Sequence, residues 1–206
     1  MIEAFSLRTA HYFGDALASQ ACLRYRVFVK QRGLAHSAFE GMEYDEFDTP
    51  GAVYLTWRDE QQVVRGLIRL LPTTLPYMVQ NYWPHLFADA PLPCSRSVWE
   101  ATRLCVDRTY TSPQRVRIMP EILCALQEYC SAHGITSVIG VTRKHLLEHF
   151  LRTGVHWLGP VDIVEGKEEA AFSVPATHLR PEHHCRKLGI EGSVLRLMPD
   201  PDRRAA

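Results

Sequence analysis

The sequence has no surplus of charge of either sign, because 23 Lys and Arg residues balance 23 Asp and Glu residues in a chain of 206. A protein that binds nucleic acid through bulk positive charge is therefore not expected. Apolar runs long enough to cross a bilayer are also missing, and the first residues lack the basic and apolar stretches of a signal peptide. We therefore expect a cytoplasmic protein that has neither nucleic acid nor a membrane as a partner.

Cysteine is sparse and scattered along the chain. The six cysteines, at positions 22, 94, 105, 124, 130 and 185, form no CxxC pair. This spacing is typical of reduced thiols in a cytosolic protein. The triplet HHC at 183–185 has no second ligand cluster at a zinc spacing, so we expect no metal and no other cofactor.

Apolar periodicity predicts one domain, residues 1–206, in which hairpins precede a strand–helix–strand–helix run. This order is typical of an α/β fold with a mixed sheet. The expected strands span 2–7, 52–57, 63–71, 97–107, 136–142, 155–159, 161–165 and 170–176, and the expected helices span 14–32, 112–133 and 144–154. The proline-rich segment 72–95 is expected to be a long surface loop, and the chain from about residue 200 to be disordered.

The two longer helices are expected to bury one face each. The predicted core positions are Leu17, Ala21, Tyr25, Phe28 and Val29 in the first, and Ile118, Ile122, Leu126 and Tyr129 or Cys130 in the second. Ser112 is the expected N-cap of the second helix, and Gly134 follows its end.

An acidic stretch, EYDEFD at residues 43–48, stands just before an apolar strand. An extended chain would direct Glu43 and Asp45 to one side and Glu46 and Asp48 to the other. The stretch is either a solvated loop or a site that holds a cationic group.

Four further charged residues lie within otherwise apolar segments. Arg24 is in the first helix, Arg69 in the strand 63–71, and Glu100 and Arg103 in the strand 97–107. Taken singly, each is a solvent-facing residue of an amphipathic element. Taken together they predict a polar cleft, in which arginines would bind a carboxylate or phosphate and the acids a cation.

Four blocks with this charge pattern occur in order: RYRVFVKQRGL (24–34), EYDEFDTPGAVYL (43–55), VVRGLIRLLPTTLPYM (63–78) and VWEATRLCVD (98–107). With them the chain resembles the acyl-homoserine lactone synthases, the autoinducer synthases of quorum sensing, over roughly residues 5–176. One position departs from the family pattern, since Leu34 stands where the family usually has Trp.

The resemblance implies a GNAT-like N-acyltransferase fold, a twisted mixed sheet with a V-shaped cleft flanked by helices. It implies an enzyme that acylates the amine of S-adenosylmethionine from an acyl thioester, closes the lactone and releases 5′-methylthioadenosine. Both molecules are substrates, so no cofactor is implied. The implied substrate-binding residues are Arg24, Phe28, Glu43, Asp45 and Asp48, and the implied catalytic residues are Glu100, Arg69 and Arg103.

The role of Glu100 has two alternatives at this stage, a base that deprotonates the substrate amine or a purely electrostatic group. Backbone N–H groups near residues 103–105, at a bulge in the strand, are implied as the oxyanion site. The candidate acyl pocket is Leu104, Cys105, Val106, Thr142, Leu146 and Phe150, although ordinary core is an equal interpretation of these positions.

The acyl donor could be coenzyme A or acyl carrier protein. Basic residues of one helix, Arg143, Lys144, His145, His149 and Arg152, suit either donor. The similarity to the coenzyme-A-using members, which make branched or aryl products, favours acyl-CoA. Two alternatives remain: a synthase that uses acyl carrier protein, and a non-catalytic paralogue that binds S-adenosylmethionine or an acyl ligand. The oligomeric state is not predicted.

Overall fold

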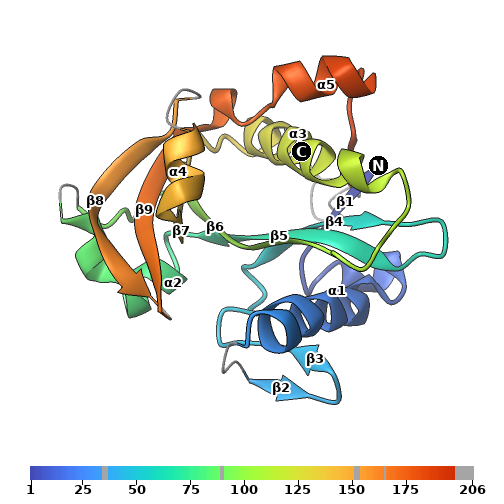
Figure 1. The fold of residues 1–206 in the computed structure, drawn as a ribbon, viewed down its shortest axis with the longest axis horizontal. Coiled ribbons are helices and arrows are strands. Elements are labelled where there is room, and N and C mark those ends of the chain that lie inside the picture. Colours follow the sequence, from blue (N-terminus) through green and yellow to red (C-terminus); the bar gives the residue numbers. More distant parts are fainter. Residues whose placement is uncertain (34–36, 89–90, 151–153, 165, 198–206) are drawn as a thin grey trace, which may run out of the picture.

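An eight-stranded mixed sheet forms the centre of the computed structural model, which describes residues 1–33, 37–88, 91–150, 154–164 and 166–197. The strand order is β10-β1-β4-β5-β6-β7-β9-β8, and the β1–β10 and β6–β7 pairs are parallel (Figure 1). The strands are β1 (Ile2–Phe5), β4 (Val53–Arg58), β5 (Val64–Pro72), β6 (Val98–Val106), β7 (Ser137–Arg143), β8 (His156–Val164), β9 (Lys167–Pro175) and β10 (Leu195–Leu197).

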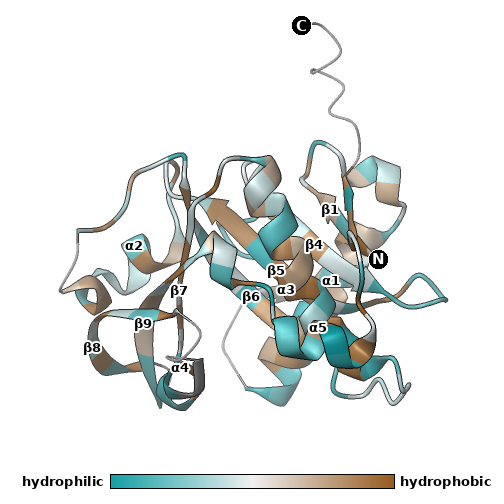
Figure 2. Ribbon diagram, turned by 90° about the horizontal axis from the view of Figure 1, so that it is seen from above, coloured by the Kyte–Doolittle hydropathy of each residue, from teal (hydrophilic) through white to brown (hydrophobic). Residues whose placement is uncertain are grey.

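Helices cover both faces of the sheet. Figure 1 shows α3 and α5 on one face, and α1 with the small β2–β3 hairpin on the other. The remaining elements are η1 (Ala10–Phe13), α1 (Ala16–Arg24), the π-helix η2 (Tyr25–Gln31), β2 (Ala38–Phe39), β3 (Met42–Glu43), α2 (Met78–Tyr82), η3 (Pro84–Phe87), α3 (Arg115–Ala132), α4 (Lys144–Phe150), η5 (Ala176–His178) and α5 (Glu182–Leu188). Hydrophobic residues concentrate on β4 and β5, whereas α5 is largely hydrophilic (Figure 2).

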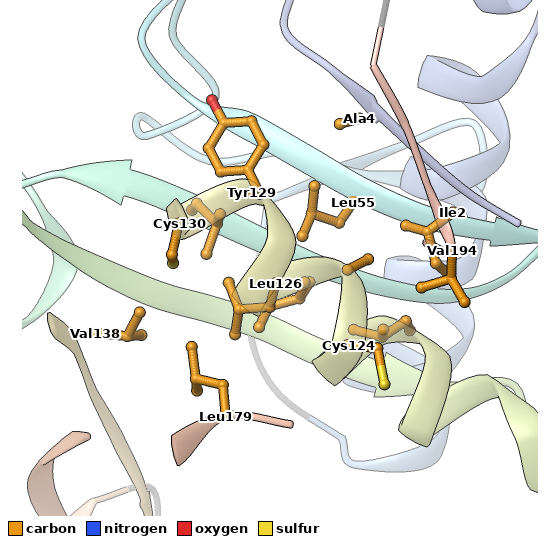
Figure 3. Close-up of a cluster of buried hydrophobic side chains, with 14 of the residues drawn as sticks. Ile2, Ala4, Leu55, Cys124, Leu126, Tyr129, Cys130, Val138, Leu179 and Val194 are labelled. Atoms are coloured by element: carbon orange, nitrogen blue, oxygen red, sulfur yellow. The ribbon is translucent and has the colours of Figure 1, made fainter. Parts of the chain in front are cut away.

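The apolar residues of the sheet divide into two cores, because successive side chains of a strand point to opposite faces. On the α3 face, Leu55 packs with Leu126 and Val138, and Figure 3 shows them around α3. On the α1 face, Tyr54 packs with Phe28 and Leu67. The polar site described below lies on this second face, beside a packed core that excludes water.

The sheet opens between β6 and β7. These two parallel strands pair only from Val98–Glu100 to Ser137–Ile139, although β6 continues to Val106 and β7 to Arg143. Beyond Glu100 the two strands separate, while β7 stays paired with β9 along its whole length. The V-shaped opening of a GNAT-like fold is therefore confirmed.

A β-bulge lies on β6 at this opening. Leu67 of β5 pairs with Cys105, but Arg69 pairs with Thr102, so Ile68 alone opposes two residues of β6, Arg103 and Leu104. Arg103 has a φ of 55°, which is uncommon for a residue other than glycine. The bulge turns the Arg103 side chain toward the α1 face and confirms the predicted irregularity of this strand.

Most of the predicted elements are confirmed, and the differences have physical causes. The segment 72–95 is not simply a loop, because α2 and η3 form within it and bury Tyr77, Val79 and Leu86. The burial of these three side chains stabilises the two short helices despite the prolines of the segment. The segments 155–159 and 161–165 belong to one strand, β8, with an irregularity between Trp157 and Val161.

Smaller differences concern the ends of elements. The helix predicted from Gly14 begins as α1 at Ala16 and continues as the π-helix η2 after Arg24. Ser112 is not the N-cap of α3, which begins at Arg115, and Pro120 is accommodated inside this helix. The sequence interpretation missed α5 and β10. The tail from residue 200 and Leu34 lie outside the described residues.

No helix of the described ranges combines the length and apolarity needed to cross a membrane. Within the same ranges, no group of three or more His, Cys, Asp or Glu side chains is placed to hold a metal ion.

Candidate active site

Arg24 occupies the junction between α1 and the π-helix and is fully buried. Its Nη1 and Nη2 donate to Oδ1 and Oδ2 of Asp48 at 2.7 and 3.0 Å, and its Nε donates to Glu43. Burial alone would lower the pKa of Arg24, but the hydrogen bonds and charges of these two carboxylates raise it. Arg24 is therefore a fixed cation, held by two acids of the acidic stretch that follows 19 and 24 residues later in the chain.

Arg69 reaches the same acids from β5. Its Nη1 and Nη2 donate to the two oxygens of Asp45 at 2.6 and 2.9 Å, and Nη1 also donates to Asp48 at 2.8 Å. Its Nε donates to Thr102 on the neighbouring strand at 3.0 Å. The two arginines thus share Asp48, and every donor nitrogen of Arg69 has an acceptor.

Arg103 completes the group from the bulge of β6. Its Nη2 lies 2.9 Å from Glu43 and 2.7 Å from Asp45. The resulting ion cluster consists of Arg24, Arg69, Arg103, Glu43, Asp45 and Asp48, three guanidinium groups and three carboxylates. Charge balance makes its burial possible, since isolated buried charges are too costly.

The acids converge because residues 45–48 form a turn. The backbone nitrogen of Asp48 donates to the carbonyl of Asp45 at 3.1 Å, and the nitrogen of Asp45 donates to the Asp48 carboxylate at 2.8 Å. The expectation that Asp45 and Asp48 point to opposite sides of an extended chain is therefore wrong. The solvated-loop interpretation is also wrong for Glu43, which is fully buried. Burial would raise the pKa of both aspartates, but the arginines lower it.

The ion cluster is exposed at one edge. Asp45 is the most exposed acid of the ion cluster, at 12% against 7% for Asp48, and Arg103 is its most exposed arginine, at 7%, whereas the side chains of Arg24, Glu43 and Arg69 are completely covered. A ligand would therefore first meet the Asp45–Arg103 pair.

Phe28 forms an apolar wall beside this edge. It is buried, and the guanidinium carbons of Arg103 and Arg32 lie 5.4 and 4.8 Å from the centre of its ring. Such cation–π contacts help to orient the two guanidinium groups over the ring.

Glu100 is the last residue of β6 that pairs with β7, so it lies next to the opening of the sheet. Its two carboxylate oxygens accept hydrogen bonds from the backbone nitrogens of Met78 and Val79. Burial raises the pKa of Glu100 to about 7, against the two N–H donors and the charges of Arg69 and Arg103, which lower it. Burial therefore outweighs the neighbouring arginines, which alone would lower this pKa.

The candidate acyl-pocket residues do not all gather at one place. Leu104 is partly exposed at the bulge, and Cys105 is buried beside it in the core of the α1 face. Val106 packs on the opposite, α3 face, and Leu146 is 42% exposed on α4. Thr142 is half-buried on β7. The Phe150 side chain lies outside the described residues.

Cys105 is close to the site but is not activated. Burial raises the pKa of its thiol to about 12, so the group stays protonated at neutral pH. The thiolate, not the thiol, is the nucleophile in cysteine catalysis.

Besides Thr102, which accepts from Nε of Arg69, sequence reasoning missed Tyr54 and Met78, which also contact the ion cluster. The hydroxyl of Tyr54 donates to Asp48 at 2.7 Å, and the sulfur of Met78 lies 3.4 Å from Nη2 of Arg69. The signal for Tyr54 was its alternation within β4, which places it opposite Arg69 on β5. No local pattern points to Met78.

Two hollows lie near the site. The larger, about 770 Å³, lies behind the acidic turn and is lined by Arg8, Glu46, Phe47, Thr49, Pro50, Gly51, Leu75, Pro76 and Asn81, so it includes no member of the ion cluster. The smaller, about 310 Å³, is lined by Arg143, Lys144, His145 and Lys167 together with Glu148, Ile163, Gly166 and Glu168. This second hollow adjoins the open end of β7 and carries several of the predicted basic residues.

Comparison with known proteins shows the family of the chain. The family profile described as "Autoinducer synthase" matches residues 13–186. The acyl-homoserine-lactone synthase of Ralstonia nicotianae is 31% identical over 97% of this chain and 93% of its own length. The isovaleryl-homoserine lactone synthase of Bradyrhizobium diazoefficiens is 32% identical over 84% of this chain and 79% of its own length.

Solved structures show the same relationship. BjaI, a CoA-dependent acyl-homoserine lactone synthase solved with SAM and isopentyl-CoA, superposes with a TM-score of 0.85 at 29% identity over 98% of this chain and 95% of its own. MesI, also CoA-dependent, gives 0.81 at 25% identity over 95% and 98%. A putative N-acetyltransferase from Lactobacillus plantarum, 18% identical over 85% and 98% with a TM-score of 0.57, shares the fold alone. The chain belongs to the autoinducer synthase family.

Proposed function

We propose that this chain makes an N-acyl-homoserine lactone from S-adenosylmethionine and an acyl-CoA, as a quorum-sensing acyltransferase. The observation that carries the proposal is the balanced ion cluster at the edge of the opening between β6 and β7. Its exposed pair, Asp45 and Arg103, offers one anion and one cation to an amino acid. S-adenosylmethionine presents the matching ammonium and carboxylate, and its sulfonium adds a further positive charge.

The acyl transfer follows from this placement. The ammonium loses its proton, and the free amine attacks the thioester carbonyl, so a C–N bond forms and the C–S bond breaks with departure of the thiol. Negative charge develops on the carbonyl oxygen, and backbone N–H groups of the bulge at Arg103–Cys105 are the proposed donors to it. Phe28 excludes water from the reacting groups, which strengthens these interactions.

Lactone closure is an intramolecular displacement. A carboxylate oxygen attacks the carbon next to the sulfonium, a C–O bond forms, the C–S bond breaks, and neutral 5′-methylthioadenosine leaves. An arginine that holds the carboxylate near this carbon would supply much of the rate by orientation alone. Arg103 at the exposed edge is the proposed group, and the buried Arg24, Arg69, Glu43 and Asp48 fix the positions of Arg103 and Asp45.

Coenzyme A is the proposed carrier of the acyl group. Both CoA-dependent synthases named above superpose over nearly the whole chain. At the open end of β6 and β7, the charges of Arg143 and Arg108 act, with burial, to lower the pKa of Arg32. None of these three arginines forms an ion pair within the described ranges, so they suit the phosphates of the carrier.

A short branched or aryl acyl group is the proposed substrate. The relative from Bradyrhizobium diazoefficiens is described as an isovaleryl-homoserine lactone synthase. On the α3 face, Trp99 and Tyr129 pack edge-on with ring centres 6.2 Å apart, and we propose that these rings shorten the acyl pocket.

The test is a thiol-release assay with S-adenosylmethionine and a panel of acyl-CoA thioesters beside the matched acyl carrier proteins, with mass spectrometry of the products. We expect turnover with a short branched or aryl CoA. Turnover with acyl carrier protein alone would refute acyl-CoA as the donor. Binding of S-adenosylmethionine without release of methylthioadenosine would refute the synthase activity. Asp45→Asn should abolish turnover, whereas Asp59→Asn, at an acid paired with Arg65 away from the cluster, is the matched control.

A further inference from the structure

Both carboxylate oxygens of Glu100 accept a hydrogen bond from the backbone of another element, which gives this residue a structural contact besides any role in proton transfer. Oε2 lies 2.7 Å from the backbone nitrogen of Met78, and Oε1 lies 3.0 Å from that of Val79. The residue is 1% exposed. The two N–H donors bind the charged carboxylate more strongly than the neutral acid, so a proton on Glu100 would weaken the contact with Met78 and Val79.

These two N–H groups belong to the first turn of α2. The first donors of a helix have no partner inside the helix and need acceptors from elsewhere. Tyr77, which precedes α2, makes no side-chain capping hydrogen bond. Glu100 on β6 supplies the missing acceptors, and so fixes the start of α2 relative to the opening of the sheet.

The helix that Glu100 holds is also a wall of the ion cluster. The Met78 sulfur lies 3.4 Å from Nη2 of Arg69 and 3.6 Å from Nη1 of Arg103. At the far end of α2, the Tyr82 ring packs edge-on against Phe47 of the acidic turn, with ring centres 5.7 Å apart. A shift of α2 would therefore change the contact of Met78 with both arginines.

We infer that Glu100 is a positioning residue that anchors the first turn of α2, so that Met78 holds Arg69 and Arg103 in place and Arg103 can bind the carboxylate of S-adenosylmethionine. The inference rests on the proposed function, because it assigns Arg103 to that substrate. Loss of the anchor weakens substrate binding more than it slows the chemistry. The substrate ammonium then releases its proton to water.

Met78 offers a matched pair of variants. Tyr77 is extended, with φ −135° and ψ 163°, which is the conformation that a following proline requires. Met78→Pro removes the N–H and the thioether at a first helical position, where proline is well tolerated. Met78→Ala removes the thioether and keeps the N–H. The difference between them reports on the hydrogen bond that Glu100 accepts.

The kinetic test combines Glu100→Gln with each Met78 variant in double-mutant cycles. We expect Glu100→Gln to raise the KM for S-adenosylmethionine about tenfold or more, with a smaller change in kcat. Glu100→Gln should add little to Met78→Pro and should keep its full effect on Met78→Ala. A fall in kcat at unchanged KM, equally large in both double variants, would overturn the inference and make Glu100 the base.

Amide proton resonances of Met78 and Val79 give a readout that needs no turnover. In the wild-type chain both should be shifted downfield and protected from exchange. In Glu100→Gln the side chain keeps one acceptor oxygen, so at least one of the two amides should lose protection. Unchanged amides in that variant would refute the anchor even if activity fell. If the wild-type chain showed no turnover but its amide protection still depended on Glu100, the proposed function would be refuted and the anchoring role of Glu100 would stand.

Discussion

Replacing Asp48 by Asn tests whether the ion cluster is a stabilising unit of the fold as well as a binding site. The Asp48 carboxylate accepts hydrogen bonds from Arg24 at 2.7 and 3.0 Å, from Arg69 at 2.8 Å, from the Tyr54 hydroxyl at 2.7 Å and from the Asp45 nitrogen at 2.8 Å. The substitution leaves three guanidinium groups facing two carboxylates, and it turns an amide N–H₂ toward donors.

Removing one partner of a buried charge network typically costs about 3–5 kcal/mol. The Asp48 side chain is only 7% exposed, so solvent screens the loss little. For a chain of this size, such a loss lowers the Tm by roughly 6–20 °C. Urea unfolding with an unchanged m-value is the assay, and Tyr54→Phe, which removes one donor and no charge, is the smaller matched change, at about 1 kcal/mol. A loss below about 1 kcal/mol for Asp48→Asn would refute the reasoning.

The pH dependence of this effect has a defined sign. Burial alone would raise the pKa of Asp48, but the hydrogen bond from Arg24 and the charges of Arg69 and Arg24 hold it well below its usual range. A carboxylate with a depressed folded pKa contributes stability above its unfolded pKa of about 4, and this contribution disappears as the pH falls further. The gap in stability between wild type and Asp48→Asn should therefore narrow below about pH 4, and a constant gap down to about pH 2 would contradict the assignment.

Three further substitutions test separate features. Gln20→Leu should raise the free energy of unfolding by about 1 kcal/mol, because both amide atoms of Gln20 are buried without a partner in the described structure; lower stability in urea would contradict this. Cys105→Ala should keep kcat within about threefold, since its thiol is protonated; a hundredfold loss would show that the sulfur reacts. Gly66→Ala should destabilise by about 1–3 kcal/mol, because a Cβ there would overlap Ile118 and lie 2.9 Å from Ile122; an unchanged Tm would show that α3 can move.

Local sequence patterns predicted those parts of the protein that depend on near neighbours. The stripe Ile118, Ile122, Leu126 and Tyr129 predicted the buried face of α3, and all four residues are buried. Two apolar runs joined by a polar turn predicted β4 and β5, each within one residue at both ends. Helical and strand periods are set by the backbone itself, so a short window of sequence carries them.

The candidate site was predictable as a set of residues and not as a geometry. Charges inside apolar segments singled out Arg24, Arg69 and Arg103, since burying a charge requires a partner elsewhere. Which acid meets which arginine depends on the turn at residues 45–48 and on the bulge of β6. The turn is closed by hydrogen bonds between Asp45 and Asp48, whereas the bulge is fixed by the pairing of β6 with β5.

The sequence by itself therefore determined the charged residues of the site, the family and most of the strands and helices of the sheet. Only the tertiary structure decided that Asp48 and Asp45 face the same arginines, that α2 forms in a proline-rich segment, and that Glu100 binds its first turn. The physical reason is desolvation. A buried carboxylate takes whatever donors the packed sheet and helices bring to it, and those donors come from residues far away in the chain.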